Sequence, residues 1–233
     1  MVEVSIVIAS LEKPKELFED IKKQSFKDYE IVLVTGKMQI PKAYNIGFKR
    51  AKGRKIVIVE SDVRIYDRSW LANMVKAIDK YKVVKADQVE ANDFVDTPNN
   101  VGIDAKIAKA HLFDESIIVG EDIDWYEKIR QDGYDFKRLR QPIVWHFRKW
   151  NPKKYIMWRF WIGMSYSKTA LRYSNPNMNF KRIVLSRGFA FTDFVLTLIG
   201  EICGFVRYFY LIFYRKKTAR KTTNLSKLLD AGE

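Results

Sequence analysis

The chain has 233 residues, enough for one α/β domain with an appendage, and its 47% hydrophobic content allows a sizeable core and excludes a largely disordered chain. A single cysteine, Cys203, excludes an internal disulfide framework and suits a reducing compartment. The N-terminus shows no secretory signal, so we expect a cytoplasmic location.

The net charge of +14 is concentrated in the back part of the chain. Residues 1–146 carry 25 Lys and Arg against 24 Asp and Glu, whereas residues 147–233 carry 17 against 4. This asymmetry predicts an anionic partner for the back part, which would be a membrane surface, a nucleic acid or a phosphorylated lipid.

The first sixty residues alternate Val/Ile-rich runs with amphipathic stretches. The runs at 2–10, 29–35 and 55–61 predict strands covered on both faces, and the stretches at 14–24 and 41–53 predict helices between them. This order predicts right-handed crossovers, and therefore an α/β fold with a mostly parallel sheet flanked by helices.

The rest of the front part predicts five further segments. Residues 68–81 and 120–133 are typical of helices, 83–91 and 142–146 of strands, and 92–102 of a loop rich in Asn, Asp, Pro and Gly.

The character of the chain changes after His146. Residues 151–173 and 188–217 predict helices rich in aromatic and basic side chains. Three charged residues interrupt the second stretch, and each would cost a few kcal/mol at mid-bilayer, so helices lying in the membrane interface are favoured. Packing against the domain or a second copy, and a true span, are the alternatives. We therefore expect a domain at 1–147 and a helical membrane-association region at 148–233.

Two carboxylates follow the strand predicted at 55–61. Glu60 and Asp62 lie at a strand's carboxyl end, where ligands bind in open α/β sheets, and residues two apart project to the same side. Hard anionic ligands of this kind suit Mg²⁺ or Mn²⁺ bound to a diphosphate. Alternatively, Asp62 caps the following turn and Glu60 is solvated.

A second acidic cluster opens the helix predicted at 120–133. Glu121, Asp122 and Asp124 include a candidate general base, although acidic residues are also favoured there by the helix dipole. His146, near a strand end, is either a hydrogen-bonded core residue or a contact of a cation or phosphate.

Several short motifs occur in an order that resembles the GT-A glycosyltransferases of the family-2 type, which are inverting enzymes that use nucleotide-activated sugars. The motifs are AYNIGFKRAKG (43–53), ESD (60–62), FDE (113–115), GEDID (120–124) and PIVWHF (142–147). The resemblance covers roughly residues 1–147 and implies a GT-A, Rossmann-like fold.

The resemblance also implies roles for individual residues. Asp62, helped by Glu60, would hold a divalent metal on the diphosphate of the donor, with His146 as a further ligand. Asp122 would deprotonate the acceptor, with Glu121 beside it and Asp124 as a rival base. The implied donor-binding residues are Ala9, Ser10, Thr35, Lys42, Asn45, Glu60 and Ser61.

The sequence departs from the family at both nucleoside-binding turns. The first strand ends ASLE (9–12) where the family has Pro-x-Tyr-Asn, and the second ends VTGK (34–37) where the family has Asp-Asp-Gly-Ser. The aspartate that reads the nucleotide base is therefore missing. The metal-binding triplet also begins with Glu instead of Asp, which preserves charge and lengthens the reach.

Together these features predict a metal-dependent sugar transferase on the inner face of the cell membrane. Its partners would be a nucleotide-sugar donor, anionic lipids and a hydroxyl or phosphate acceptor that is lipid-linked, with a homo-oligomer through the C-terminal helices as an option. The alternative is an inactive GT-A domain that serves as a membrane scaffold. We expect no nucleic-acid partner, because the aromatic residues of the basic tail lie within long aliphatic runs.

Overall fold

The computed structural model describes residues 2–90, 93–95, 100–117 and 120–147, and beyond these only residues 199, 202 and 203. The chain divides into two units, residues 1–150 and 151–233. Apart from residues 199, 202 and 203, which are helical, the helices predicted in the second unit lie outside the described residues, and the boundary at 147 stays a prediction. Within the described residues, no helix has the length and apolar character needed to cross a bilayer.

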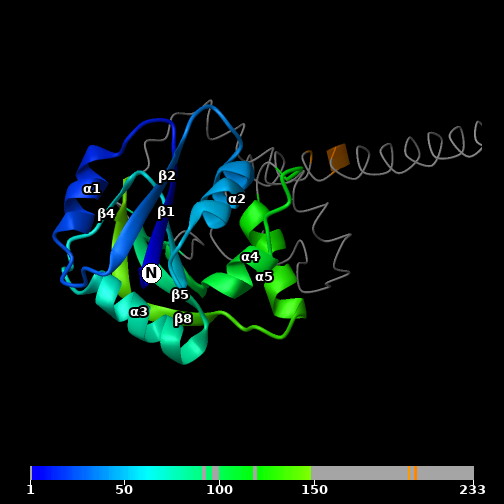
Figure 1. Ribbon diagram of the computed structural model, residues 1–233. Helices are drawn as coiled ribbons and strands as arrows, with labels where there is room; N and C mark the ends of the chain where they lie inside the picture. Colours follow the sequence, from blue (N-terminus) through cyan, green and yellow to red (C-terminus); the bar gives the residue numbers. More distant parts are fainter. Residues whose placement is uncertain are drawn as a thin grey trace, which may run out of the picture. The chain divides into compact units, whose positions relative to one another are not determined.

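Eight strands form one sheet in the order β2-β1-β3-β7-β5-β8-β4, with β6 beside β5 (Figure 1). The strands are β1 Val4–Ser10, β2 Tyr29–Thr35, β3 Lys55–Val59, β4 Val63–Arg64, β5 Val83–Glu90, β6 Asp93–Val95, β7 Asn100–Asp104 and β8 Lys137–His146. The helices are α1 Lys15–Lys22, α2 Ile40–Arg50, α3 Trp70–Tyr81, α4 Ala105–Ala110 and α5 Glu121–Gln131.

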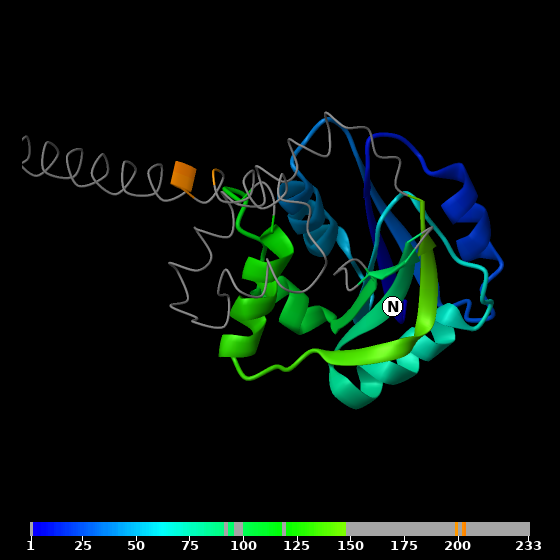
Figure 2. The same ribbon diagram turned by 180° about the vertical axis from the view of Figure 1, so that it is seen from behind.

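Helices cover both faces of the sheet, as the two opposite views show (Figures 1 and 2). Alternation along β1 explains the two layers, because Ile6 and Ile8 pack with α1 and α3, while Val7 packs with α2. The α4 and α5 helices join the second layer, where Trp125 and Phe113 stack with ring centroids 4.7 Å apart. The predicted α/β class with flanking helices is confirmed.

The prediction of a mostly parallel sheet is wrong, because the sheet is mixed. Strand β1 pairs in parallel with β2 and β3, and β5 with β8, but β7 runs antiparallel between β3 and β5. The segment 92–102 was predicted to be a loop, yet its described residues contribute to β6 and β7.

Gly102 explains how β7 fits in the centre of the sheet. A Cβ at this position would lie 2.7 Å from Cδ1 and 2.8 Å from Cγ1 of Ile78 on α3, so a side chain here would push Ile78 away from the strand. The glycine that favours a loop in the sequence is therefore a packing requirement in the structure.

Candidate active site

The β3 strand ends one residue before the first predicted ligand. Glu60 and Asp62 lie in the link from β3 to the short β4, which pairs antiparallel with the end of β8, so that Val63 lies opposite His146. The backbone N–H of Phe147 also donates to the carbonyl of Asp62, at 3.0 Å. This ladder brings together three side chains that are far apart in the sequence.

The three side chains form a tight cluster. Nε2 of His146 lies 3.0 Å from Oε2 of Glu60 and 3.1 Å from Oδ1 of Asp62, and each residue offers a ligand atom within 4.8 Å of the others. The imidazole is buried, Glu60 is half-buried and the Asp62 side chain is 49% exposed. The cluster is thus buried at His146 and open to solvent at Asp62.

The donor set fits a hard divalent cation. Two carboxylates and an imidazole suit Mn²⁺ or Mg²⁺, and exposure at Asp62 leaves room for oxygen ligands from a bound molecule. The alternative, in which Asp62 only caps the following turn, does not explain why a buried imidazole lies against both carboxylates.

The start of α5 supplies a second pair of carboxyl groups. Burial first, and then the negative charges of Asp122 and Glu60, raise the pKa of Glu121 to about 8, against backbone hydrogen bonds that lower it. Burial also raises the pKa of Asp122, against the opposing influence of its backbone hydrogen bonds and of the Lys85 charge. Both groups therefore lie in surroundings that penalise ionisation.

Tyr44 on α2 links the two acidic segments electrostatically. The pKa of its buried hydroxyl lies well above the ordinary value, first because of burial and then because of negative charge from Glu60, Glu121, Asp62 and Asp122. The carboxylates that follow β3 and those that open α5 therefore lie within electrostatic reach of one side chain.

Asp124 has a different environment from Asp122. Its side chain is fully buried and pairs with Lys128 one turn along α5, at 2.9 Å. An ion pair within the helix is a structural role, so Asp124 is the weaker candidate for a catalytic base.

The predicted donor-binding residues lie at three places, which are the ends of β1 and β2, the α2 helix and the link from β3 to β4. Ala9, Ser10 and Thr35 are at the carboxyl ends of the paired strands β1 and β2, where Ser10 lies opposite Thr35. Lys42 is exposed on α2, and Ser61 is half-buried between the two predicted ligands.

Asn45 has a defined structural task. Its buried amide donates to the carbonyl of Phe113 at 3.0 Å and to Glu115 at 2.9 Å, and it accepts from the N–H of Phe113 at 2.8 Å. The asparagine of the AYNIG motif thus fastens α2 to the FDE segment. A predicted contact with sugar or diphosphate would have to be made alongside these bonds.

Sequence reasoning missed three residues of this region. The carboxylates raise the pKa of Tyr44, the charge of Lys85 lowers the pKa of Asp122, and Gln88 on β5 contacts His146. Only Gln88 left a signal in the sequence, because it follows Val84 and Ala86 at a spacing of two and so interrupts the apolar face of a strand with an amide.

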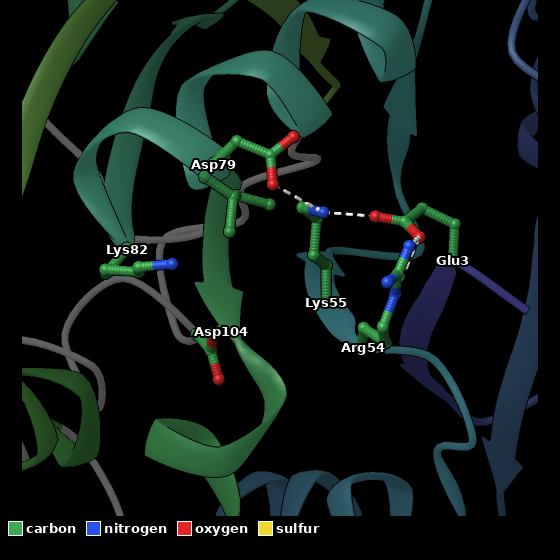
Figure 3. Close-up of a pocket in the computed structure, with 7 residues that line it drawn as sticks. Glu3, Arg54, Lys55, Asp79, Lys82 and Asp104 are labelled. Carbon is green, nitrogen blue, oxygen red and sulfur yellow. Dashed lines mark hydrogen bonds and ion pairs between the residues drawn. The ribbon is translucent and has the colours of Figure 1, made fainter.

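A cavity of about 310 Å³ lies at the other end of the sheet, where β3 begins (Figure 3). Its lining includes the buried Lys55, which pairs with Glu3 and, at 2.7 Å, with Asp79. These pairs tie the start of β1 to β3 and α3, which is a structural role. The cavity is separate from the clustered carboxylates.

No protein-family model and no curated protein sequence matches the chain. Solved structures with a similar fold include residues 1–349 of S. aureus TarS in complex with UDP, at 14% identity and a TM-score of 0.54, covering 84% of this chain and 81% of that chain. The complex with UDP-GlcNAc gives 14% identity and a TM-score of 0.56, covering 84% and 80%. The mannosyltransferase PcManGT from Pyrobaculum calidifontis, in complex with GDP-Man and Mn²⁺, gives 15% identity and a TM-score of 0.58, covering 87% and 69%.

These neighbours are glycosyltransferases with a GT-A-like fold. At such low sequence identity the likeness shows the fold alone, and it supports the predicted Rossmann-like, GT-A type of α/β structure. The family-2 assignment and the inverting chemistry stay predictions.

Proposed function

We propose that the protein is an inverting glycosyltransferase of the family-2 type, which moves a sugar from a nucleotide-sugar donor to a hydroxyl or phosphate acceptor. The observation that carries the proposal is the cluster of Glu60, Asp62 and His146 at the end of β3, in a GT-A-like fold. Structural neighbours in complex with UDP, UDP-GlcNAc or GDP-Man support a nucleotide-sugar donor, and the Mn²⁺ bound to one of them supports a divalent cofactor.

Each acidic segment has a role in this proposal. Glu60, Asp62 and His146 would hold Mn²⁺ or Mg²⁺, which when bound supplies positive charge against the departing diphosphate. Asp122 would take the proton of the acceptor as its oxygen attacks the anomeric carbon and the bond to the diphosphate breaks. Burial makes Asp122 a stronger base once ionised, and the Lys85 charge favours its ionised form.

The donor and acceptor are proposed only as classes. Ala9, Ser10 and Thr35 would contact the nucleoside, and Lys42 would approach the diphosphate. The second strand ends without the aspartate that reads the nucleotide base, so the proposal does not name the nucleotide of the donor. The basic region at 148–233 supports a place on the inner face of the cell membrane, with anionic lipids, a lipid-linked acceptor and the option of a homo-oligomer.

The role of Asp122 is tested by Asp122→Asn. Loss of a general base should lower kcat for transfer or donor hydrolysis by about 10²–10⁴-fold. Binding of the donor with Mn²⁺ should change little, and Asp124→Asn is the matched control on the same helix. Turnover of Asp122→Asn equal to that of the unaltered protein would remove Asp122 from the mechanism.

A second candidate is an inactive GT-A domain that acts as a membrane scaffold. The observation that favours it is the VTGK sequence at 34–37, which lacks the aspartate that reads the base. Binding of any nucleotide-sugar with Mn²⁺ would count against the scaffold.

A further inference from the structure

Gln88 on β5 is the residue that faces the other nitrogen of His146. Its Nε2 lies 3.3 Å from Nδ1 of the imidazole, and both residues are 1% exposed. Oε1 of Gln88 is also buried and has no hydrogen-bond partner among the residues that the structure describes. A buried amide whose NH₂ group has a hydrogen-bond partner while its oxygen has none is unusual, because an unsatisfied buried acceptor costs about 1–3 kcal/mol.

The contacts of His146 define the cation-free state. Nε2 lies within 3.1 Å of an oxygen of Glu60 and an oxygen of Asp62, and the negative charge of these carboxylates favours the tautomer that carries its hydrogen on Nε2. In a neutral imidazole with its hydrogen on Nε2, Nδ1 of His146 accepts a hydrogen bond. The side-chain NH₂ group of Gln88 is placed to donate that bond.

Cation binding reverses these requirements. A ligating imidazole presents a lone pair at Nε2 and carries its hydrogen on Nδ1, which then needs an acceptor. A half-turn about the last bond of Gln88 exchanges its amide oxygen and nitrogen, and this places Oε1 against Nδ1.

We propose that Gln88 is the positioning residue of the cation site, and that its amide reverses to fix the tautomer in which His146 ligates the metal. The proposal rests on the cation site of the proposed function. It assigns to Gln88 a contact with His146 only, and no contact with substrate.

The test compares Mn²⁺ affinity among variants of the full chain, measured by electron paramagnetic resonance of the free ion. Gln88→Met keeps the volume and removes the acceptor, so it should weaken Mn²⁺ binding by about 10–100-fold. Gln88→Glu keeps an acceptor for Nδ1–H and should restore most of the lost affinity.

The matched control is Gln24→Met. Gln24 is also a buried glutamine, but its amide bonds to the backbone of Asp20, Asp67 and Leu71. Gln24→Met should leave Mn²⁺ affinity unchanged whatever it does to stability, so it separates a local effect from general weakening of the fold.

A second readout is the tautomer of His146, measured by nitrogen NMR with and without Mg²⁺. The chain has two histidines, and His111, which contacts Asp132 at 2.7 Å, is an internal reference. Added Mg²⁺ should move the hydrogen of His146 from Nε2 to Nδ1 in the unaltered protein. In Gln88→Met this shift should be lost or should need far more Mg²⁺.

The outcomes separate the two claims. Equal Mn²⁺ affinity in Gln88→Met and the unaltered protein, or a Gln88→Glu as weak as Gln88→Met, overturns the role of Gln88 and leaves the cation site standing. An unaltered protein that binds neither Mn²⁺ nor Mg²⁺ rejects the cation site, and the role of Gln88 with it.

Discussion

Burial governs the two carboxyl groups at the start of α5. The pKa of Glu121 rises from its ordinary value of 4.5 to about 8, so between these two values the unfolded chain loses a proton that the folded chain retains. The unfolded state then binds fewer protons, and stability falls as pH rises. The contribution of Glu121 is fully present below its ordinary pKa and is lost as pH rises through about 8.

Glu121→Gln should flatten this fall and make the protein more stable than the unaltered chain at about pH 8, because an amide has no charge to bury. Urea denaturation in the presence of a chelator, repeated across this pH range, measures the effect. Glu127→Gln is the control, since Glu127 lies on the same helix and pairs with Arg130 at 3.1 Å. Parallel profiles for Glu121→Gln and the unaltered protein would contradict the assigned burial.

For individual residues, the sequence indicated which side chains could bind a metal but not which other residues contact them. Glu60 and Asp62 stand two residues apart after an apolar run, which is a local pattern that can be recognised. The partners of His146 depend on the pairing of β4 with β8 and of β5 with β8, and such long-range contacts have no local pattern. The contact of Gln88 with His146, and the place of Tyr44 near the carboxylates, could therefore be identified only in the structure.

The position of the α2 helix depends on one glycine. A Cβ at Gly47 would overlap Cγ1 of Val7 on β1, so the helix lies closer to the strand than a side chain at position 47 permits while Val7 keeps its place. This close approach lets α2, which carries Tyr44 and Asn45, pack against Val7 of the sheet. The glycine of the AYNIG motif thus has a packing reason.

Gly47→Ala should destabilise the protein, because overpacking costs about 1–3 kcal/mol and outweighs the gain of about 1 kcal/mol in helix propensity. In a Val7→Ala background the overlap disappears, and the same substitution should be neutral or stabilising. Urea denaturation of the four proteins in this cycle measures the coupling. If the changes in unfolding free energy for Gly47→Ala and Val7→Ala are additive, α2 does not press on Val7.

Prediction of elements succeeded where the patterns are long and failed where polar residues take part in the sheet. The first strands and helices were predicted to within a few residues, because Val/Ile runs and proline or glycine punctuation mark them. β8 begins at Lys137, five residues before the predicted strand, because KRLRQ (137–141) is polar. β7 was missed because Asn100 and Gly102 are typical of loops.

For the whole molecule, the main feature is the division of charge along the chain. The front part is nearly neutral and carries the carboxylate cluster, and the excess of basic residues lies at 147–233. Attraction of basic side chains to an anionic membrane is worth about 1 kcal/mol for each Lys or Arg near the surface, and salt screens it.

The full chain should therefore float with vesicles that contain anionic lipids, bind neutral vesicles less, and lose part of its binding as salt rises. A chain ending at Trp150, the last residue of the first unit, should stay with the soluble fraction. Flotation of this shorter chain to the same extent as the full chain would contradict the proposed role of the back part.

The most direct test of the proposed function is isothermal calorimetry with a panel of nucleotide-sugars, including UDP-GlcNAc and GDP-Man, with and without Mn²⁺. The cluster of Glu60, Asp62 and His146 predicts that at least one donor binds, that binding requires Mn²⁺, and that Asp62→Asn weakens it by more than about tenfold. Donor binding that is equally tight without Mn²⁺, or no heat with any member of the panel, would contradict a donor site built on this cluster.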